Sequence, residues 1–199
     1  MCSSDLATVE NLDEYLDVLR KPHVLGNSWI QSSALAVRNG ETPAGFLGFP
    51  PMWRLSNAST VDPASLGTRT PATEFTRVAR TDVFGYVNLK HEYPNATESP
   101  VVWAKATFEN DRPQRIFIGM GSNDDAVVYL NGSRIFHVET ERGRAELFDD
   151  DIIVMNLSPG SNEIVIGVAD RGGAQWGFYL RIADATGRQA DGIRWTTVE

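Results

Sequence analysis

Acidic and amide side chains gather in the stretch GSNDDAVVYLNG, which runs from Gly121 to Gly132. Oxygen atoms at this density could bind a cation, bind the hydroxyl groups of a ligand, or accept backbone N–H bonds in turns. Turn chemistry is favoured, because Asn-Gly between two strand-like runs is the strongest short-range signal of a β-hairpin. We therefore predict that Asp124, Asp125, Asn131 and Gly132 are structural turn residues.

A second group with ligand-binding chemistry lies in the sequence ADRGGAQW. Asp170 supplies acceptors, Arg171 supplies fixed donors for sugar hydroxyls or a carboxylate, and Gln175 adds an amide. Exposed aromatic rings stack on the C–H faces of sugars, and Trp29 and Trp53 lie in irregular segments that could present them. These five residues are the predicted ligand-binding set. The alternatives are that the arginine only solvates a turn and that the tryptophans are packed.

The sequence predicts no catalytic residue and no metal ligand. Asp149, Asp150 and Asp151 could contribute to a structural calcium site, but neighbouring side chains of a strand alternate in direction. The spacing also lacks the Asp-x-Asp-x-Asp-Gly pattern of a dedicated calcium loop. The three histidines lie far apart, and no Gly-x-Ser-x-Gly elbow occurs. Apart from that possible calcium ion, we expect no cofactor.

The elements that must position these residues are strands from Thr76 onward. The last run, QWGFYLRIAD, alternates strictly, with Trp176, Phe178, Leu180 and Ile182 on one side. The other strand-like runs cover residues 101–108, 114–121, 126–130, 133–139, 152–157 and 163–170. Short runs with turn signals every 8–12 residues or so predict an antiparallel sandwich or barrel.

One further turn residue is expected at the corner SPGSN. Asn162 follows Pro159-Gly160 there, and its amide could satisfy backbone groups at the start of the next strand. We therefore add it to the structural turn residues.

The N-terminal part has a different pattern. Residues 8–21 place apolar side chains at helical spacing, with acids early and bases late, so we predict one amphipathic helix that ends at Pro22. It either packs on the sheet or couples the chain to a preceding domain. The first six residues, MCSSDL, match the translation of a common sequencing-library adapter, and we exclude them from fold reasoning. The expected organisation is 1–6 as adapter-derived, 7–26 as helix and linker, and 27–199 as a β-sandwich.

Composition excludes some classes of function. A formal charge of −8 at pH 7 repels the phosphate backbone, so we expect no nucleic-acid partner. No apolar run approaches the ~18 residues of a membrane span. The hydrophobic fraction of 42% and the charged fraction of 22% are those of an ordinary globular protein.

Residues 75 to 185 resemble a known family. The runs RIFIGMGSNDDAVVYLNGSRIF and LSPGSNEIVIGVADRGGAQWGFYLRIAD are similar to a bacterial form of the galactose-binding-like β-sandwich. In that pattern a strand ends in Gly-Ser-x-Asp-Asp, an Asn-Gly hairpin and a Leu-x-x-Gly-x-Asn turn follow, and a Gly-Trp-Gly-Phe strand closes the domain. The resemblance implies a module that is usually non-catalytic, that often accompanies glycoside hydrolases, and that in many cases binds sugars.

Together these observations predict an all-β fold, an antiparallel jelly-roll β-sandwich with one N-terminal helix. The predicted function is a non-catalytic carbohydrate-binding module within a larger bacterial protein, in an extracellular or periplasmic setting. The first alternative is a structural or protein-interaction domain accessory to a neighbouring hydrolase. The second is a small hydrolase whose site the sequence does not reveal.

Overall fold

The computed structural model describes residues 43–60, 62–69, 71–72, 74–82, 84–96, 99–140, 143–145, 147, 149–173, 175–185 and 187–196. The predicted N-terminal helix, Trp29 and the six adapter-like residues lie outside the described residues. Among those described, no helix combines the length and apolar character needed to cross a membrane.

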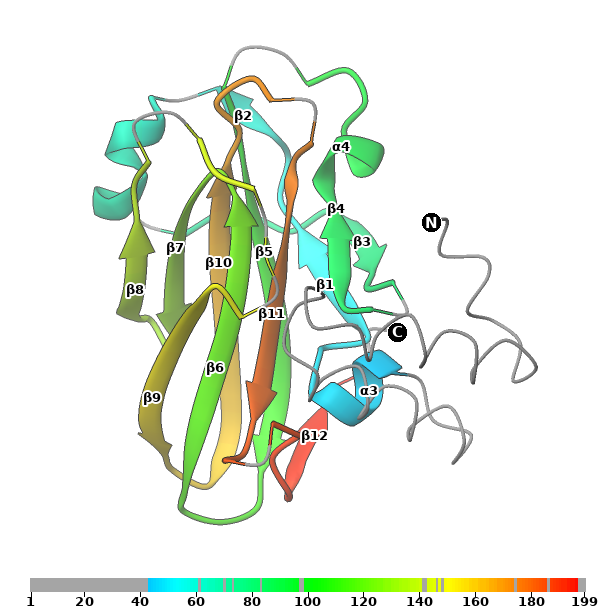
Figure 1. Ribbon diagram of the computed structural model, residues 1–199, viewed down its shortest axis with the longest axis vertical. Coiled ribbons are helices and arrows are strands. Elements are labelled where there is room, and N and C mark those ends of the chain that lie inside the picture. Colours follow the sequence, from blue (N-terminus) through cyan, green and yellow to red (C-terminus); the bar gives the residue numbers. More distant parts are fainter. Residues whose placement is uncertain are drawn as a thin grey trace, which may run out of the picture.

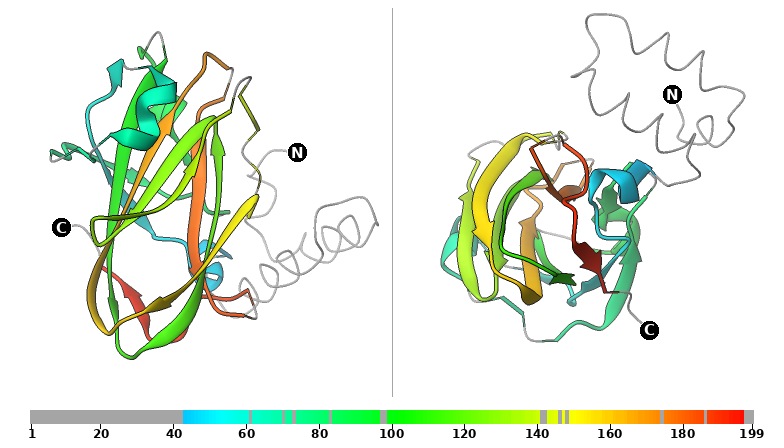
Figure 2. Two further views of the ribbon diagram at one scale, coloured as in Figure 1. Left: turned by 90° about the vertical axis from the view of Figure 1, so that its left-hand side faces the viewer. Right: turned by 90° about the horizontal axis from the view of Figure 1, so that it is seen from below.

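The fold consists of two antiparallel sheets packed face to face, as Figure 1 and Figure 2 show. The larger sheet has the order β3-β1-β5-β10-β7-β8, with β2 and β12 also paired to β5. Its strands are β1 (Met52–Leu55), β2 (Ser59–Thr60), β3 (Arg77–Arg80), β5 (Pro100–Asn110), β7 (Asp125–Leu130), β8 (Ser133–Val138), β10 (Gly160–Ala169) and β12 (Ile193–Trp195). The smaller sheet, in the order β4-β11-β6-β9, contains β4 (Tyr86–Asn88), β6 (Gln114–Asn123), β9 (Asp151–Leu157) and β11 (Gly177–Ala183). The prediction of a mainly β, antiparallel fold is confirmed.

Short helices connect the strands. They are α3 (Pro43–Leu47), the 3-10 helix η3 (Pro63–Thr68) and α4 (Leu89–Glu92). The Asn88 side chain caps α4 by accepting a 2.9 Å bond from the backbone N–H of His91.

Alternation along the strands builds the core. Phe178, Leu180 and Ile182 of β11 are at most 1% exposed and belong to one apolar cluster with residues from the facing sheet, including Ile164 and Ile166 of β10. The alternating pattern of QWGFYLRIAD therefore identified the inward side of its strand. Burial of these side chains is the main source of stability in such a fold.

The outer face of the larger sheet is covered too. Leu66 of η3 packs in a second apolar cluster with Val101, Trp103 and Val127, whose side chains alternate with the inward set. Trp103 is 5% exposed and lies opposite Gly167 in the register of β5 and β10. A Cβ atom at Gly167 would lie 2.8 Å from the indole ring, so the glycine makes room for the tryptophan.

The hairpin between β7 and β8 turns at Asn131 and Gly132. Their φ angles are +50° and +77°, and a type I′ turn needs positive φ at both positions. The Asn131 side chain donates to Oδ1 of Asn162 at 2.9 Å and accepts from the backbone N–H of Glu163 at 2.9 Å. The structure thus brings two of the predicted turn residues together, and they fix the hairpin to the start of β10.

Replacing Gly132 with alanine is expected to lower the free energy of unfolding by about 1–2 kcal/mol, because an L side chain resists left-handed φ. A steric clash does not contribute to this loss of stability, since a Cβ atom at this position would have no heavy atom within 4 Å. Chemical denaturation measures the change.

The matched control is Gly173→Ala. Gly173 is exposed, its φ lies outside the left-handed region, and the nearest atom to an added Cβ is at an ordinary 3.5 Å. Equal losses in the two variants would contradict the turn assignment.

Candidate functional site

Two ends of the sandwich carry polar clusters. At one end β10 stops and β11 begins, and at the other end β11 stops near α3 and β12 (Figure 1). Asp170, Arg171 and Gln175 lie at the first end. A hollow lies at the second.

Asp125 anchors the cluster at the first end. Its side chain is fully buried, and its Oδ1 accepts bonds from the backbone N–H of Thr140 at 2.7 Å and from the Thr140 hydroxyl at 2.9 Å. Its Oδ2 accepts from Nε of Arg171 at 3.0 Å and lies 2.7 Å from Nη2. Both oxygens are therefore engaged inside the protein.

The carboxylates of Asp124 and Asp170 also accept hydrogen bonds from backbone N–H groups. Oδ1 of Asp124 accepts from the backbone N–H of Arg144 at 2.9 Å, and Oδ2 accepts from that of Arg171 at 2.7 Å. Oδ1 of Asp170 accepts from the N–H groups of Gly172 at 2.8 Å and Gly173 at 3.0 Å. Asp124 therefore ties the segment at Arg144 to the segment at Arg171, and Asp170 closes a turn within its own loop.

The predicted ligand-binding residues have different environments. The hydrogen bond to Asp125 raises the pKa of Arg171, and it directs the guanidinium toward the protein. Gln175 is exposed, whereas Asp170 is 2% exposed. Trp53 is 1% exposed and packs edge-to-face on Phe178 at 5.1 Å between ring centroids. This corrects the expectation for Trp53, because a ring in the core has no surface with which to meet a ligand.

The acidic triplet is paired with two arginines. Asp149 accepts from Nε of Arg181 at 2.9 Å, while Asp150 and Asp151 lie 3.3 and 2.7 Å from guanidinium nitrogens of Arg144. Within the described part of the chain, no group of three or more His, Cys, Asp or Glu side chains is placed to hold a metal ion.

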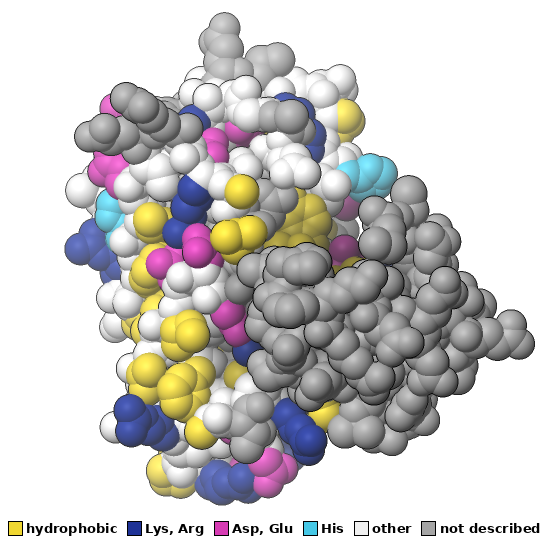
Figure 3. All heavy atoms as spheres, viewed as in Figure 1, with side chains coloured by type: hydrophobic (Ala, Val, Ile, Leu, Met, Phe, Trp, Pro, Cys, Tyr) yellow, Lys and Arg dark blue, Asp and Glu magenta, His cyan; other side chains and the backbone are white. Residues whose placement is uncertain are grey.

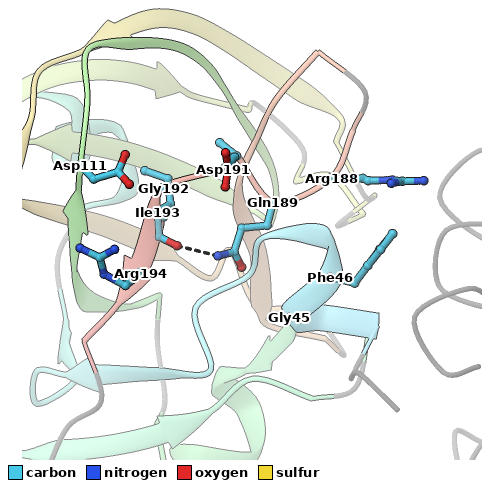
Figure 4. A pocket seen from close by; sticks show the side chains of 10 residues that line it. Gly45, Phe46, Asp111, Arg188, Gln189, Asp191, Gly192, Ile193 and Arg194 are labelled. Atoms are coloured by element: carbon cyan, nitrogen blue, oxygen red, sulfur yellow. Dashed lines mark hydrogen bonds between the residues drawn. The ribbon is translucent and has the colours of Figure 1, made fainter. Parts of the chain in front are cut away.

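The hollow at the second end, here called the end hollow, has a volume of about 750 Å³ (Figure 4). Pockets of roughly 300–1,000 Å³ hold small ligands. Its side-chain groups come from Phe46, Asp111, Arg188, Gln189, Asp191 and Arg194. The sequence patterns predicted none of them as site residues.

Arg181 positions two walls of the end hollow. It is 7% exposed, and its Nη1 donates to the carbonyl oxygens of Leu47 at 3.2 Å and Gly187 at 2.6 Å. Leu47 ends α3, which contributes Phe46, and Gly187 precedes Arg188. One buried guanidinium therefore connects both segments to β11.

Backbone bonds complete this frame. Gln189 donates its N–H to the carbonyl of Phe46 at 2.9 Å, and its side-chain amide donates to the carbonyl of Ile193 at 2.7 Å (Figure 4). The guanidinium carbon of Arg188 lies 5.1 Å from the centroid of the Phe46 ring, which is cation–π geometry. The result is an aromatic ring, an amide, two carboxylates and two guanidinium groups around one concave surface.

Neither a family model nor a curated protein sequence matches the chain. Several solved structures are similar to this chain. A β-glucosidase from Kluyveromyces marxianus in complex with glucose has a TM-score of 0.44 at 15% identity, over 67% of this chain and 16% of that one. The PA14 domain of the antifreeze protein MpAFP has a TM-score of 0.47 at 11% sequence identity, and the match covers 77% of this chain and 93% of that domain. A family 35 carbohydrate-binding module from Clostridium thermocellum has a TM-score of 0.35 at 15% sequence identity, and the match covers 67% of this chain and 92% of that module.

The chain thus spans 16% of the length of the β-glucosidase. At TM-scores below 0.5, these likenesses carry no argument about what this chain does. Its function has to be inferred from its own residues.

Arg171→Ala is expected to lower the free energy of unfolding by about 1–3 kcal/mol, because Oδ2 of the buried Asp125 would lose its charged donors. Thermal and chemical denaturation measure the loss. Arg80→Ala is the control: Arg80 is an exposed arginine of β3, and its removal should change stability by no more than about 0.5 kcal/mol. A melting temperature for Arg171→Ala equal to that of the control would contradict the structural role of Arg171.

Proposed function

We propose that this protein is a non-catalytic carbohydrate-binding module and that the end hollow is its binding site. The observation that carries the proposal is the lining of the hollow. A sugar presents C–H faces that pack on an aromatic ring such as Phe46, and hydroxyl groups that bond to amides, carboxylates and guanidiniums. Rigid walls reduce the entropy lost on binding, and Arg181 supplies that rigidity here.

The end hollow is preferred over the loop that the sequence predicts as the site. The charged groups of that loop are already engaged, since Arg171 bonds to Asp125 and Asp170 accepts from backbone N–H groups of its own loop. Gln175 is exposed and Arg171 is 25% exposed, so the loop remains a second candidate surface. We further propose a jelly-roll connection of the strands and a place within a larger bacterial protein, outside the cytoplasm, beside a glycan-degrading enzyme.

One observation favours the alternative of a protein-interaction domain. β9 is an edge strand of the smaller sheet, and on its outer side Ile152 is 59% exposed and Val154 is 44% exposed. Apolar side chains gather on this side of the molecule in Figure 3. Exposed apolar surface on an edge strand can receive another protein. Glycan binding separates the two functions, since an interaction domain has no need of it.

Phe46→Ala is expected to weaken glycan binding about tenfold or more, because stacking on an aromatic ring contributes on the order of 1–2 kcal/mol. A glycan array with the full chain identifies ligands, and calorimetry against the best of them measures the affinity of each variant.

Phe75→Ala is the matched control. Phe75 is also a partly exposed phenylalanine with a cation stacked on it, the amino group of Lys105 at 4.7 Å, but it lines a different hollow. Absence of binding to every glycan would reject the proposed function. Binding that survives Phe46→Ala but is lost in Gln175→Ala would move the site to the loop.

A further inference from the structure

The two acids of the end hollow already have a basic partner. Nη2 of Arg112 lies 2.7 Å from Asp191, and its Nη1 lies 3.6 Å from Asp111. The hydrogen bond from Arg112 lowers the pKa of Asp191, so this carboxylate stays ionised and paired. The single positive charge of Arg112 therefore neutralises part of the two negative charges of the acidic lining.

The two arginines of the lining differ from these acids in their surroundings. Among the described residues, no carboxylate lies within ion-pair distance of Arg188 or Arg194. Both side chains are exposed. Arg188 extends from the segment after β11 and Arg194 from β12, on different sides of the hollow (Figure 4). The hollow thus presents two exposed guanidinium groups that form no ion pair with a described residue, although Glu109 lies opposite Arg194 in the register of β5 and β12, on a protein whose net charge is −8.

Stacking orients one of these groups. Arg188 lies over Phe46, and a guanidinium stacked on a ring keeps its N–H donors in its own plane, free to point at a ligand. Two parallel N–H groups match the two oxygens of a carboxylate, and they suit a sulfate ester equally well.

We infer that the end hollow selects anionic glycans, whose carboxylate or sulfate groups are bound by Arg188 and Arg194. This inference rests on the proposed function and specifies its ligand class. The acidic remainder of the protein surface repels a polyanion, so the attraction is confined to this end of the sandwich. Neutral glycans would leave both guanidiniums without a charged partner.

Calorimetry with two matched pairs of probes tests the inference on the full chain. The first pair is an oligogalacturonide and its fully methyl-esterified form, which differ by the carboxylate charge. The second is a sulfated carrageenan oligosaccharide and the same oligosaccharide after chemical desulfation. We expect the charged member of at least one pair to bind about tenfold or more tightly than its neutral counterpart, which is the effect of one charge-assisted bond. The pair that shows the difference identifies the anionic group.

Variants then locate the charge recognition. Arg188→Gln and Arg194→Gln should each remove most of the difference between charged and neutral probes, because each variant weakens binding of the charged probe more than binding of the neutral one. Arg80→Gln, the same charge change at an exposed arginine of β3, should leave the difference intact. The cation stacked on Phe46 is that of Arg188, so the Arg194 variant tests charge without removing the stacked pair. Melting temperatures verify that each variant folds.

The possible results distinguish charge selection from carbohydrate binding as such. Equal affinities for charged and neutral members of both pairs would overturn charge selection while leaving a neutral carbohydrate-binding module. An equal loss in Arg80→Gln would overturn the assignment to the end hollow. No binding of any probe, together with an empty glycan array, would overturn the proposed function and the inference with it.

Discussion

Each sheet must bury one face against the other, and this constraint governs where the protein can bind anything. The ten-residue pairing of β10 with β5 lies in the middle of the larger sheet, and its inward side chains meet β6 and β11 in one core. The buried apolar area stabilises the fold and removes those faces from use. Only the ends and the outer faces remain for a ligand.

Parts of the outer faces are covered as well. Leu66 of η3 covers part of the larger sheet. On the smaller sheet, a Cβ at Gly119 would lie 1.9 Å from Oδ1 of Asp149, and one at Gly121 would lie 1.8 Å from the carbonyl oxygen of Leu147. These two glycines are needed because another segment rests directly on their strand. These covered parts of the outer faces are therefore closed to a ligand, whereas the ends of the sandwich are open.

The two ends use the same types of residue in opposite ways. Where β10 ends, the buried carboxylate of Asp125 and the guanidinium of Arg171 neutralise each other and hold the loops in place. At the end hollow, Arg188 and Arg194 lie on the surface without a carboxylate partner among the described residues. A buried charge requires a partner, whereas an exposed charge is stabilised by water and can exchange that water for a ligand. Composition alone therefore does not distinguish a structural loop from a binding one.

The sequence by itself determined the consecutive strands from β5 to β11, the inward side of β11 and the Asn131-Gly132 hairpin, whereas β1 to β4 and β12 were not predicted. These features depend on alternation and on backbone preferences of residues close together in the chain. Only the tertiary structure decided the rest. The burial of Trp53 depends on Phe178 of the facing sheet, and the end hollow exists because Arg181 brings α3 next to the segment after β11. Such contacts join residues distant in sequence, and no local pattern encodes which acid an arginine will meet.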